Sequence, residues 1–249
     1  MTPQALGLGS ALATGWQALM RRPALGFGGI ALYYLITMAI GYVPCLGSVA
    51  QILLTPPLQG GVTIFSLNLV DDRTPSLEDL FAGFRAYGKW MGIYWLLAFV
   101  SFIALLPCFI LASVAVYGTV SSGHRLPEQA AVPVLGAAAL LAVAAGAAGI
   151  AVLIRWAFVY FAGVESEGTI QAFTKSAEIT KGRRLELFWM LFVLTLLSFS
   201  GVLALGVGLF VTLPLAQCAT AALYRQLQPA PPRAAAGEGA PPAQWPGAG

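Results

Sequence analysis

Residues 165–192 decide how the rest of the chain is interpreted, because a charged amphipathic segment runs directly into an apolar one. The segment reads Glu165-Ser166-Glu167-Gly168-Thr169-Ile170-Gln171-Ala172-Phe173-Thr174-Lys175-Ser176-Ala177-Glu178-Ile179-Thr180-Lys181-Gly182-Arg183-Arg184, and an apolar run follows from Leu185. Acidic residues stand at the start of the expected helix and basic residues at its end, which suits the helix dipole, and Gly182 offers a stop signal. We therefore predict a surface helix over 168–182 that feeds a membrane span.

The composition of the whole chain indicates a polytopic membrane protein. Of the 249 residues, 58% are hydrophobic and 9% are charged, whereas about a quarter of the residues of a soluble domain are charged. The net charge of +3 is spread over several loops, so no basic patch predicts nucleic-acid binding. His124 and the three cysteines offer no metal-ligand spacing, so we expect no metal or cofactor. Cys45 and Cys108 either form a disulfide or, as we favour, are two small buried thiols.

The order of one surface helix and two spans occurs three times along the chain. Interfacial amphipathic helices are predicted over 3–20, 76–88 and 168–182, and Ser76 with Asp79 forms a capping box at the start of the second. Six apolar stretches of a length that crosses about 30 Å of hydrocarbon are predicted over 24–43, 48–70, 90–116, 135–158, 186–206 and 209–227. The predicted fold class is therefore all-α, a single membrane domain over 1–227 with a pseudo-threefold helix-plus-hairpin repeat.

Three further features complete this plan. Thr55-Pro56-Pro57-Leu58 in the second span of the first unit matches Thr212-Leu213-Pro214-Leu215 in the second span of the third. The Pro-, Ala- and Gly-rich residues 228–249 are predicted to form a disordered cytoplasmic tail. Of the thirteen Lys and Arg residues, eleven lie on the side of the termini, so the positive-inside rule places both termini in the cytoplasm. These residues are Arg21, Arg22, Arg73, Arg85, Lys89, Lys175, Lys181, Arg183, Arg184, Arg225 and Arg233.

The sequence also resembles a known family. The features that carry the resemblance are Ala172-Phe173 with Ser176, Lys181-Gly182, a span that opens Leu187-Phe188, and a last span with Pro214 and Tyr224-Arg225-Gln226-Leu227. They resemble uncharacterised bacterial six-span inner-membrane proteins related to the membrane domain of glycerophosphodiester phosphodiesterases. The resemblance covers most of residues 4–227. It implies a helical bundle in a bacterial cytoplasmic (inner) membrane and no established activity.

The most conspicuous polar feature lies in the second and sixth spans. Gln51, Thr55, Gln59 and Thr63 recur every four residues beside Pro56 and Pro57, and Gln217 and Thr220 follow Pro214. A proline inside a span kinks the helix and frees a backbone carbonyl, which polar neighbours or water must satisfy. Two interpretations follow. The polar side chains either bond neighbouring helices, which we favour, or line a polar path.

The charged residues allow further alternatives. Arg155 is the one charge inside the apolar run 132–164, and it is either a functional intramembrane ion or, as we favour, an interfacial side chain anchored among aromatic residues. Glu165, Glu167 and Glu178 are interpreted as a solvated face. Arg21, Arg22, Arg183 and Arg184 are expected at headgroup level, where they attract anionic lipid.

No catalytic motif appears in the sequence, so we expect no enzyme. The leading hypothesis is an integral protein of the bacterial cytoplasmic membrane that organises membrane or partner proteins through the three surface helices. The alternative is a permease or channel-like protein for a small solute or lipid, with a path lined by spans two and six. The absence of carboxylates inside the spans disfavours ion-driven transport.

Overall fold

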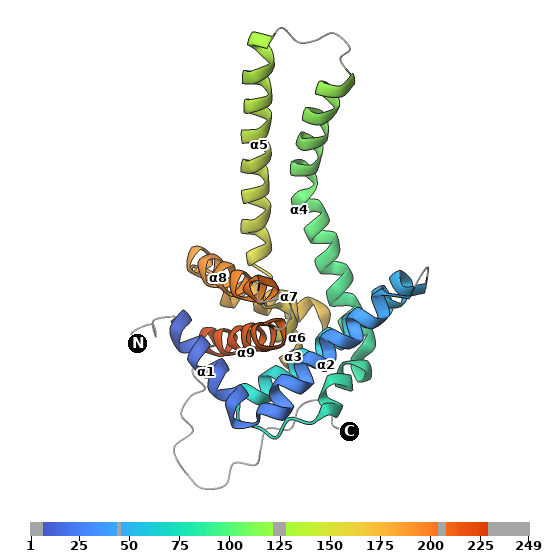
Figure 1. Cartoon of the computed structure of the whole chain (residues 1–249), viewed down its shortest axis with the longest axis vertical. Helices are drawn as coiled ribbons and strands as arrows, with labels where there is room; N and C mark the ends of the chain where they lie inside the picture. The colour runs from blue at the N-terminus through green and yellow to red at the C-terminus, as the bar shows by residue number, and fades with distance from the viewer. Residues whose placement is uncertain (1–6, 44–45, 122–127, 204–207, 229–249) are drawn as a thin grey trace.

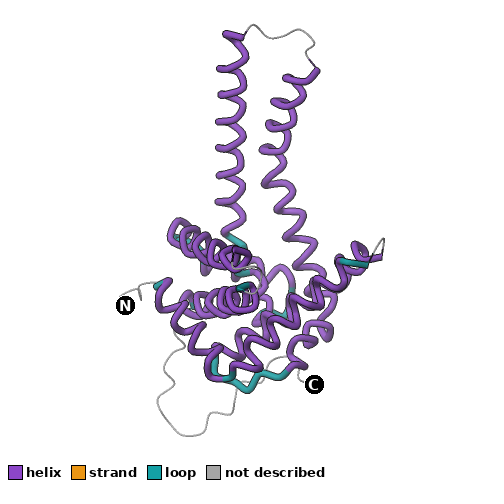
Figure 2. The backbone as a smooth tube through the Cα atoms, in the orientation of Figure 1, coloured by secondary structure: helices purple, strands orange, loops and turns teal. Residues whose placement is uncertain are grey.

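The computed structural model describes residues 7–43, 46–121, 128–203 and 208–228, and every regular element in them is a helix (Figures 1 and 2). The elements are α1 (Leu8–Arg21), α2 (Pro23–Gly41), α3 (Leu46–Val70), the 3-10 helix η1 (Leu77–Ala86), α4 (Tyr87–Ser121), α5 (Glu128–Ile154), α6 (Val159–Glu165), α7 (Thr169–Ile179), α8 (Arg184–Leu203) and α9 (Leu209–Leu227). The all-α fold class is thus confirmed for these residues. Cys45, His124 and the predicted tail over 229–249 lie outside them.

Five segments in the described part of the chain are long and apolar enough to cross a membrane. They are Pro23–Gly41, Gly47–Val70, Leu77–Ile110, Val143–Glu165 and Arg184–Gly201. The predicted sixth span, 209–227, forms α9 but is not among the five. Because Cys218, Ala219, Ala221, Leu223 and other α9 side chains are buried against protein, this helix does not need a lipid-compatible surface all round.

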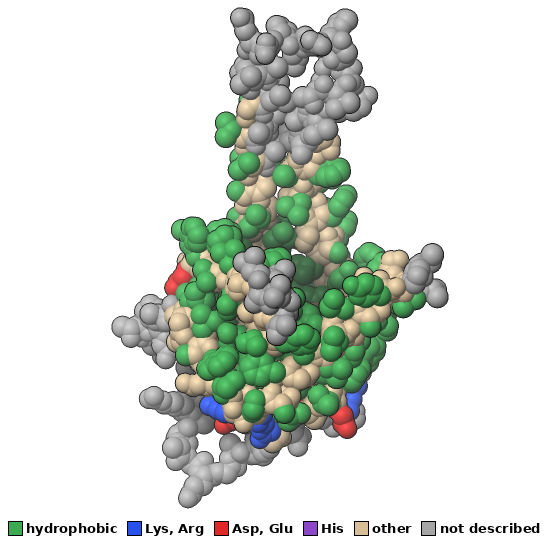
Figure 3. Space-filling model, viewed as in Figure 1, with side chains coloured by type: hydrophobic (Ala, Val, Ile, Leu, Met, Phe, Trp, Pro, Cys, Tyr) green, Lys and Arg blue, Asp and Glu red, His purple; other side chains and the backbone are tan. Residues whose placement is uncertain are grey.

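The long helices form three hairpins that diverge instead of forming one parallel bundle. In each hairpin, α2 with α3, α4 with α5 and α8 with α9, the two helices pack against each other. The α4/α5 hairpin projects far beyond the rest of the molecule, while α6 lies near the centre (Figure 1). Charged side chains visible in the space-filling view gather mostly at the lower edge, opposite this projection, and apolar side chains cover the hairpins (Figure 3).

Each short helix packs on the second arm of a hairpin, and for η1 and α7 this is the hairpin that precedes them in the chain. Thus η1 packs on α3 and α7 packs on α6, which continues the α5 arm, and α1 closes the ring by packing on α9. The contacts are close because small residues face backbone. A Cβ built on Gly83 would overlap the Pro57 carbonyl oxygen, and one on Gly15 would lie 2.8 Å from the Ala219 nitrogen. These short helices therefore use much of their apolar surface within the protein.

The predicted helix over 76–88 differs from expectation in its winding. The carboxylate of Asp79 accepts a hydrogen bond of 3.0 Å from the backbone N–H of Ser76, so the predicted capping box is present. The segment continues as a 3-10 helix, in which residues three apart lie on one face. Leu80 and Gly83 are consequently buried, while Phe81 and Phe84 are exposed and stack with 6.4 Å between ring centroids. The sequence spacing of Leu77, Leu80, Phe81 and Phe84 predicts one apolar face of an α-helix, whereas in the structure Leu80 is buried and the other three are exposed.

The predicted fourth span, 135–158, is interrupted near its end. The helix α5 ends at Ile154, and the short helix α6 begins at Val159 after a turn. At this turn, the hydroxyls of Ser176 on α7 and of Thr180 just after it each donate a hydrogen bond to the carbonyl of Arg155 at 3.2 Å. After this turn the chain changes direction, and α6, which ends at Glu165, lies near the centre of the molecule (Figure 1).

Candidate functional site

The predicted polar stripe of α3 is divided between packing and a cavity. The Thr63 hydroxyl donates to the Gln59 carbonyl at 2.7 Å, and the Gln59 side chain accepts a short hydrogen bond from the Tyr33 hydroxyl of α2. Gln51 and Thr55, nearer the other end of α3, line an open cavity of about 400 Å³. We call this the α3 cavity, and its other lining residues are Tyr33, Thr37, Ser48, Ile52 and Tyr94.

The prolines of α3 are buried where η1 docks. Pro57 has no N–H to offer the carbonyl of Leu53, four residues earlier. The hydroxyl of Tyr87, at the start of α4, donates to this carbonyl at 3.1 Å. The freed backbone group is therefore satisfied by a side chain from the next unit. Pro214 of α9 is also buried, and it borders an apolar cavity of about 270 Å³ between α2 and α9.

A second polar cavity, which we call the α9 cavity, lies between α2, α8 and α9. Its volume is about 140 Å³. It is lined by Tyr34, Leu191, Leu194, Thr195, Ser198, Leu213, Ala216, Gln217 and Thr220. The hydroxyls of Thr195, Ser198 and Thr220 donate to carbonyls of their own helices at 2.8, 3.0 and 2.7 Å. Their oxygen lone pairs remain available as acceptors.

The side chain of Gln217 differs from these hydroxyls. Its Nε2 is buried and has no hydrogen-bond partner in the described part of the chain. A buried amide donor without a partner costs about 1–3 kcal/mol, and Gln217 is also one of the residues that line the α9 cavity. The hydroxyl oxygens of the lining accept in turn. The cavity therefore suits an uncharged guest that donates a hydrogen bond to these oxygens, water included.

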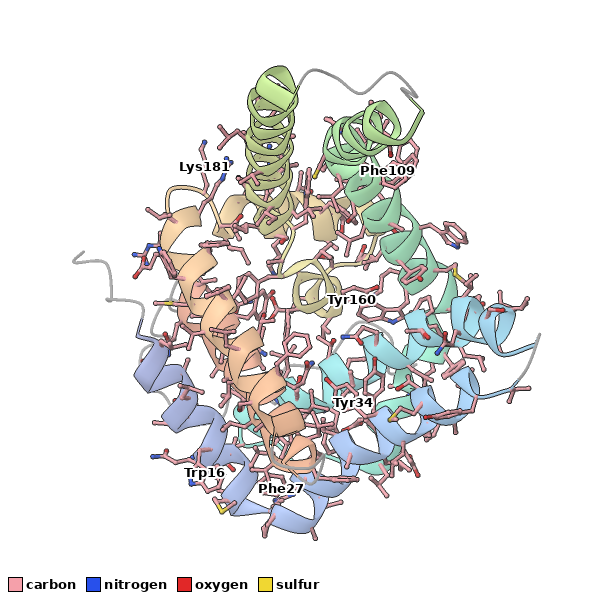
Figure 4. All side chains as sticks on the ribbon, turned by 45° about the horizontal axis from the view of Figure 1, so that its top comes forward. Trp16, Phe27, Tyr34, Phe109, Tyr160 and Lys181 are labelled. Atoms are coloured by element: carbon pink, nitrogen blue, oxygen red, sulfur yellow. The ribbon has the colours of Figure 1, made fainter. Side chains whose placement is uncertain are left out.

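The α3 cavity and the α9 cavity share no lining residue, and two adjacent tyrosines of α2 line one cavity each. Tyr33 lines the α3 cavity and Tyr34 lines the α9 cavity, and their rings meet edge to face at 5.0 Å between centroids. Figure 4 shows Tyr34 and Tyr160 inside the ring of helices, while Trp16 and Phe109 lie at its periphery. Sequence reasoning missed the tyrosines of α2. The available signal was a pair of adjacent phenols within an otherwise apolar span.

Four ionised side chains meet near the ends of α3, α6 and α9, and we call Asp71, Glu165, Lys175 and Arg225 the charged cluster. The Arg225 guanidinium binds Asp71 through two hydrogen bonds of 2.8 and 2.5 Å. Its Nη1 binds Glu165 at 2.5 Å, and the Lys175 ammonium binds the other Glu165 oxygen at 2.6 Å. Two carboxylates thus balance two cations, which makes the cluster neutral as a whole.

The charged cluster is largely shielded from solvent. The Glu165 side chain is 15% exposed and that of Arg225 is 23% exposed. Glu165 also accepts hydrogen bonds from Tyr224 at 2.8 Å and Gln228 at 2.5 Å. The interpretation of Glu165 as part of a solvated face is therefore wrong. The arrangement ties three hairpins and α7 together, with Arg225 in the last turn of α9, where a cation is favoured by the helix dipole.

A comparison with known proteins identifies the family of the chain but no activity. The model of the family described as "Protein of unknown function (DUF975)" matches residues 25–230. The chain belongs to the DUF975 family. No curated protein and no solved structure matches this DUF975 protein. Nothing in these comparisons links it to the membrane domain of glycerophosphodiester phosphodiesterases.

Arg155 of this DUF975 protein lies outside both polar cavities. It occupies the turn between α5 and α6, its side chain is exposed, and its guanidinium lies 5.6 Å from the centre of the Trp156 ring. Cys108 and Cys218 are free thiols, and Cys218 is buried. Among the cations predicted to contact lipid, Arg21 forms an exposed ion pair with Asp72 at 3.1 Å.

Proposed function

We propose that this DUF975 protein is a permease-like integral protein of the bacterial cytoplasmic membrane that binds a small, uncharged polar solute between its hairpins. The observation that carries the proposal is the polar lining of the α9 cavity, which includes Gln217 and the hydroxyl-bearing residues Thr195, Ser198 and Thr220. Neither the α9 cavity nor the α3 cavity has an ionised residue in its lining. Hydrogen bonding, and not charge, would therefore select the solute, and we expect no catalytic step.

In this proposal the charged cluster closes the cytoplasmic end of the path. Arg225 follows Gln217 by eight residues, which corresponds to about 12 Å along α9. The cluster holds the ends of three hairpins together, so solute release requires at least one of its ion pairs to separate. The distribution of Lys and Arg along the sequence favours cytoplasmic termini, which would put the cluster on that side of the membrane.

We also propose six spans and a pseudo-threefold repeat. Support for the repeat comes from the packing of η1 and α7 on the second arms of their preceding hairpins and of α1 on the second arm of the last hairpin. Asp71, Glu165 and Arg225 also stand at the ends of the three second arms. The helix α9 would be the sixth span, shielded from lipid by its neighbours. The relation to glycerophosphodiester phosphodiesterase membrane domains stays a prediction.

Cysteine accessibility tests whether water and solute reach the α9 cavity. In a background without Cys45, Cys108 and Cys218, we would place single cysteines at Thr195 and Thr220 and treat intact membranes with a small, water-soluble methanethiosulfonate. The matched control is a cysteine at Leu196, which is 53% exposed on the outer face of α8. We expect labelling in the cavity and protection at Leu196. Protection at both cavity positions would contradict a wet path.

A second candidate function is the organisation of partner proteins, and one observation favours it. On η1, Leu77, Phe81 and Phe84 are exposed by 45%, 48% and 36%, although Leu80 is buried. Replacing Phe81 and Phe84 with serine should release copurifying proteins if this surface binds them. An unchanged set of partners would leave the exposed phenylalanines as anchors in the lipid interface.

A further inference from the structure

An apolar groove lies between α5 and α8, and it shares no lining residue with either polar cavity. Its volume is about 390 Å³. The α5 side is formed by Ala147, Ile150, Ala151 and Ile154, and the α8 side by Leu185 and Phe188. Ala147 and Ala151 are four residues apart and so lie on one face of α5. Their small side chains leave the space that makes the groove.

A single charged residue, Arg184, contributes to the lining of this groove. Arg184 is exposed and forms no ion pair within the described residues, in contrast to Arg225. Glu186 is two residues further on, and residues two apart on a helix do not face the same way. The positive charge at the mouth of the groove is therefore not neutralised by its nearest acidic neighbour.

Other cations lie at the same end of the groove. Arg155 follows Ile154 directly and is exposed, while Lys181 and Arg183 precede Arg184 in the turn before α8. Figure 4 shows Lys181 near the start of α8, on the same side of the view as α5. Arg184 is thus the cation that lines the groove, and Arg155, Lys181 and Arg183 are close in sequence to its lining residues.

The position of the groove relative to the membrane selects its occupant. Arg184 is the first residue of a candidate span, and Leu185 and Phe188 follow it within the opening turns of that span. From Ile154 to Ala147 the groove follows α5 for about 10 Å. A ligand that complements this surface has an anionic end at the interface and an extended apolar chain directed into the bilayer.

We propose that the groove between α5 and α8 is a specific site for one anionic phospholipid, whose phosphate binds Arg184 and whose acyl chain lies against Ala147, Ala151 and Phe188. This site is independent of the proposed solute path. The lipid would bridge the α4/α5 hairpin and the α8/α9 hairpin, which otherwise contact each other sparingly through α5 and α8.

Native mass spectrometry of the full-length protein from nanodiscs tests the proposal. The protein is incorporated in bilayers of phosphatidylcholine with and without phosphatidylglycerol, and retained lipid is counted. We expect preferential retention of one phosphatidylglycerol, weakened about fivefold by Arg184→Gln and preserved in Arg184→Lys. The control Arg85→Gln removes an exposed positive charge from η1 and should leave retention unchanged.

Two further arms distinguish a bound lipid from a bound phosphate ion. Ala151→Phe fills the groove without changing charge, and it should abolish the retention of phosphatidylglycerol. Inorganic phosphate at millimolar concentration should not compete, because it lacks the acyl chain. Equal retention of both lipids, or equal losses in Arg184→Gln and Arg85→Gln, would overturn the proposal. Competition by inorganic phosphate with no effect of Ala151→Phe would overturn it in favour of a simple phosphate site. Circular dichroism and size exclusion verify that each variant is folded.

Discussion

Arg225 and Glu165 are 60 residues apart in the chain, yet their side chains meet at 2.5 Å. The same guanidinium holds Asp71, which is 154 residues away. A helix whose last turn carries such an arginine is fixed to two other hairpins at one point. The charged cluster is therefore the place at which small changes in sequence have the largest expected effect on the assembly of the three hairpins.

Replacing Arg225 with glutamine should destabilise the protein more than removal of any surface charge. The change leaves two shielded carboxylates without their shared cation, and breaking such a pair costs about 2–3 kcal/mol at this degree of burial. Thermal unfolding of the purified protein in detergent measures the effect. The matched control is Arg21→Gln, whose ion pair with Asp72 is 49% and 70% exposed and should contribute less than about 1 kcal/mol. Equal losses of stability would show that the cluster does not hold the hairpins.

The hydrogen bond from Tyr87 to the Leu53 carbonyl should depend on Pro57. In the natural sequence Tyr87→Phe leaves the freed carbonyl without its donor, and we expect a loss of about 1 kcal/mol. In a Pro57→Ala background the alanine N–H restores the helical bond, so the same change should cost much less. A double-mutant cycle on unfolding free energies gives the coupling. Additive effects would mean that the tyrosine does not compensate the proline.

Substitution at Gly83 should prevent η1 from docking on α3. A methyl group at this position would overlap the Pro57 carbonyl oxygen, so Gly83→Ala requires the two elements to separate. We expect a loss of at least about 2 kcal/mol and faster proteolysis within 77–86. Gly88→Ala is the control, because nothing lies within 4 Å of the added carbon. That change should be neutral or slightly stabilising.

The glutamines of the two stripes should respond differently to the loss of their amides. Gln59→Leu removes the acceptor of the Tyr33 hydroxyl and should cost about 1–2 kcal/mol. Gln217→Leu removes a buried donor that has no partner among the described residues, so stability should be unchanged or higher. The same variant should slow entry of reagents into the α9 cavity. A large destabilisation by Gln217→Leu would point to a protein partner for this amide.

The segments with strong local signals could be predicted from the sequence, and those decided by distant contacts could not. The lengths of the apolar stretches predict the hairpins, and the capping box of Ser76 and Asp79 predicts the start of η1. The winding of η1 depends on the close approach of its backbone to that of α3 at Gly83 and Gly61. A contact between these distant residues leaves no local pattern in the sequence. Likewise, α9 has the composition of a weak span because protein and not lipid surrounds most of it.

The charged cluster escaped prediction for a related reason. Helical spacing compares a residue only with neighbours three or four positions away, and for Glu165 these are Phe161, Ala162, Gly168 and Thr169, none of which is charged. The positions of Asp71, Glu165 and Arg225 at the ends of three second arms were a usable signal. A repeat about a common axis brings equivalent ends together, so applying the proposed repeat to its termini would have predicted their convergence.

The docking of α1 on α9 has a consequence for biosynthesis. The Gln226 side chain accepts a hydrogen bond of 3.3 Å from the Gly7 backbone N–H and donates one of 3.1 Å to the Ser10 hydroxyl. Both bonds join residues that are more than two hundred positions apart in the chain. During translation α1 therefore has no such partner until α9 has been synthesised. Over that interval its apolar face must be held by lipid or by the insertion machinery, and closure of the ring waits for the ribosome to release α9.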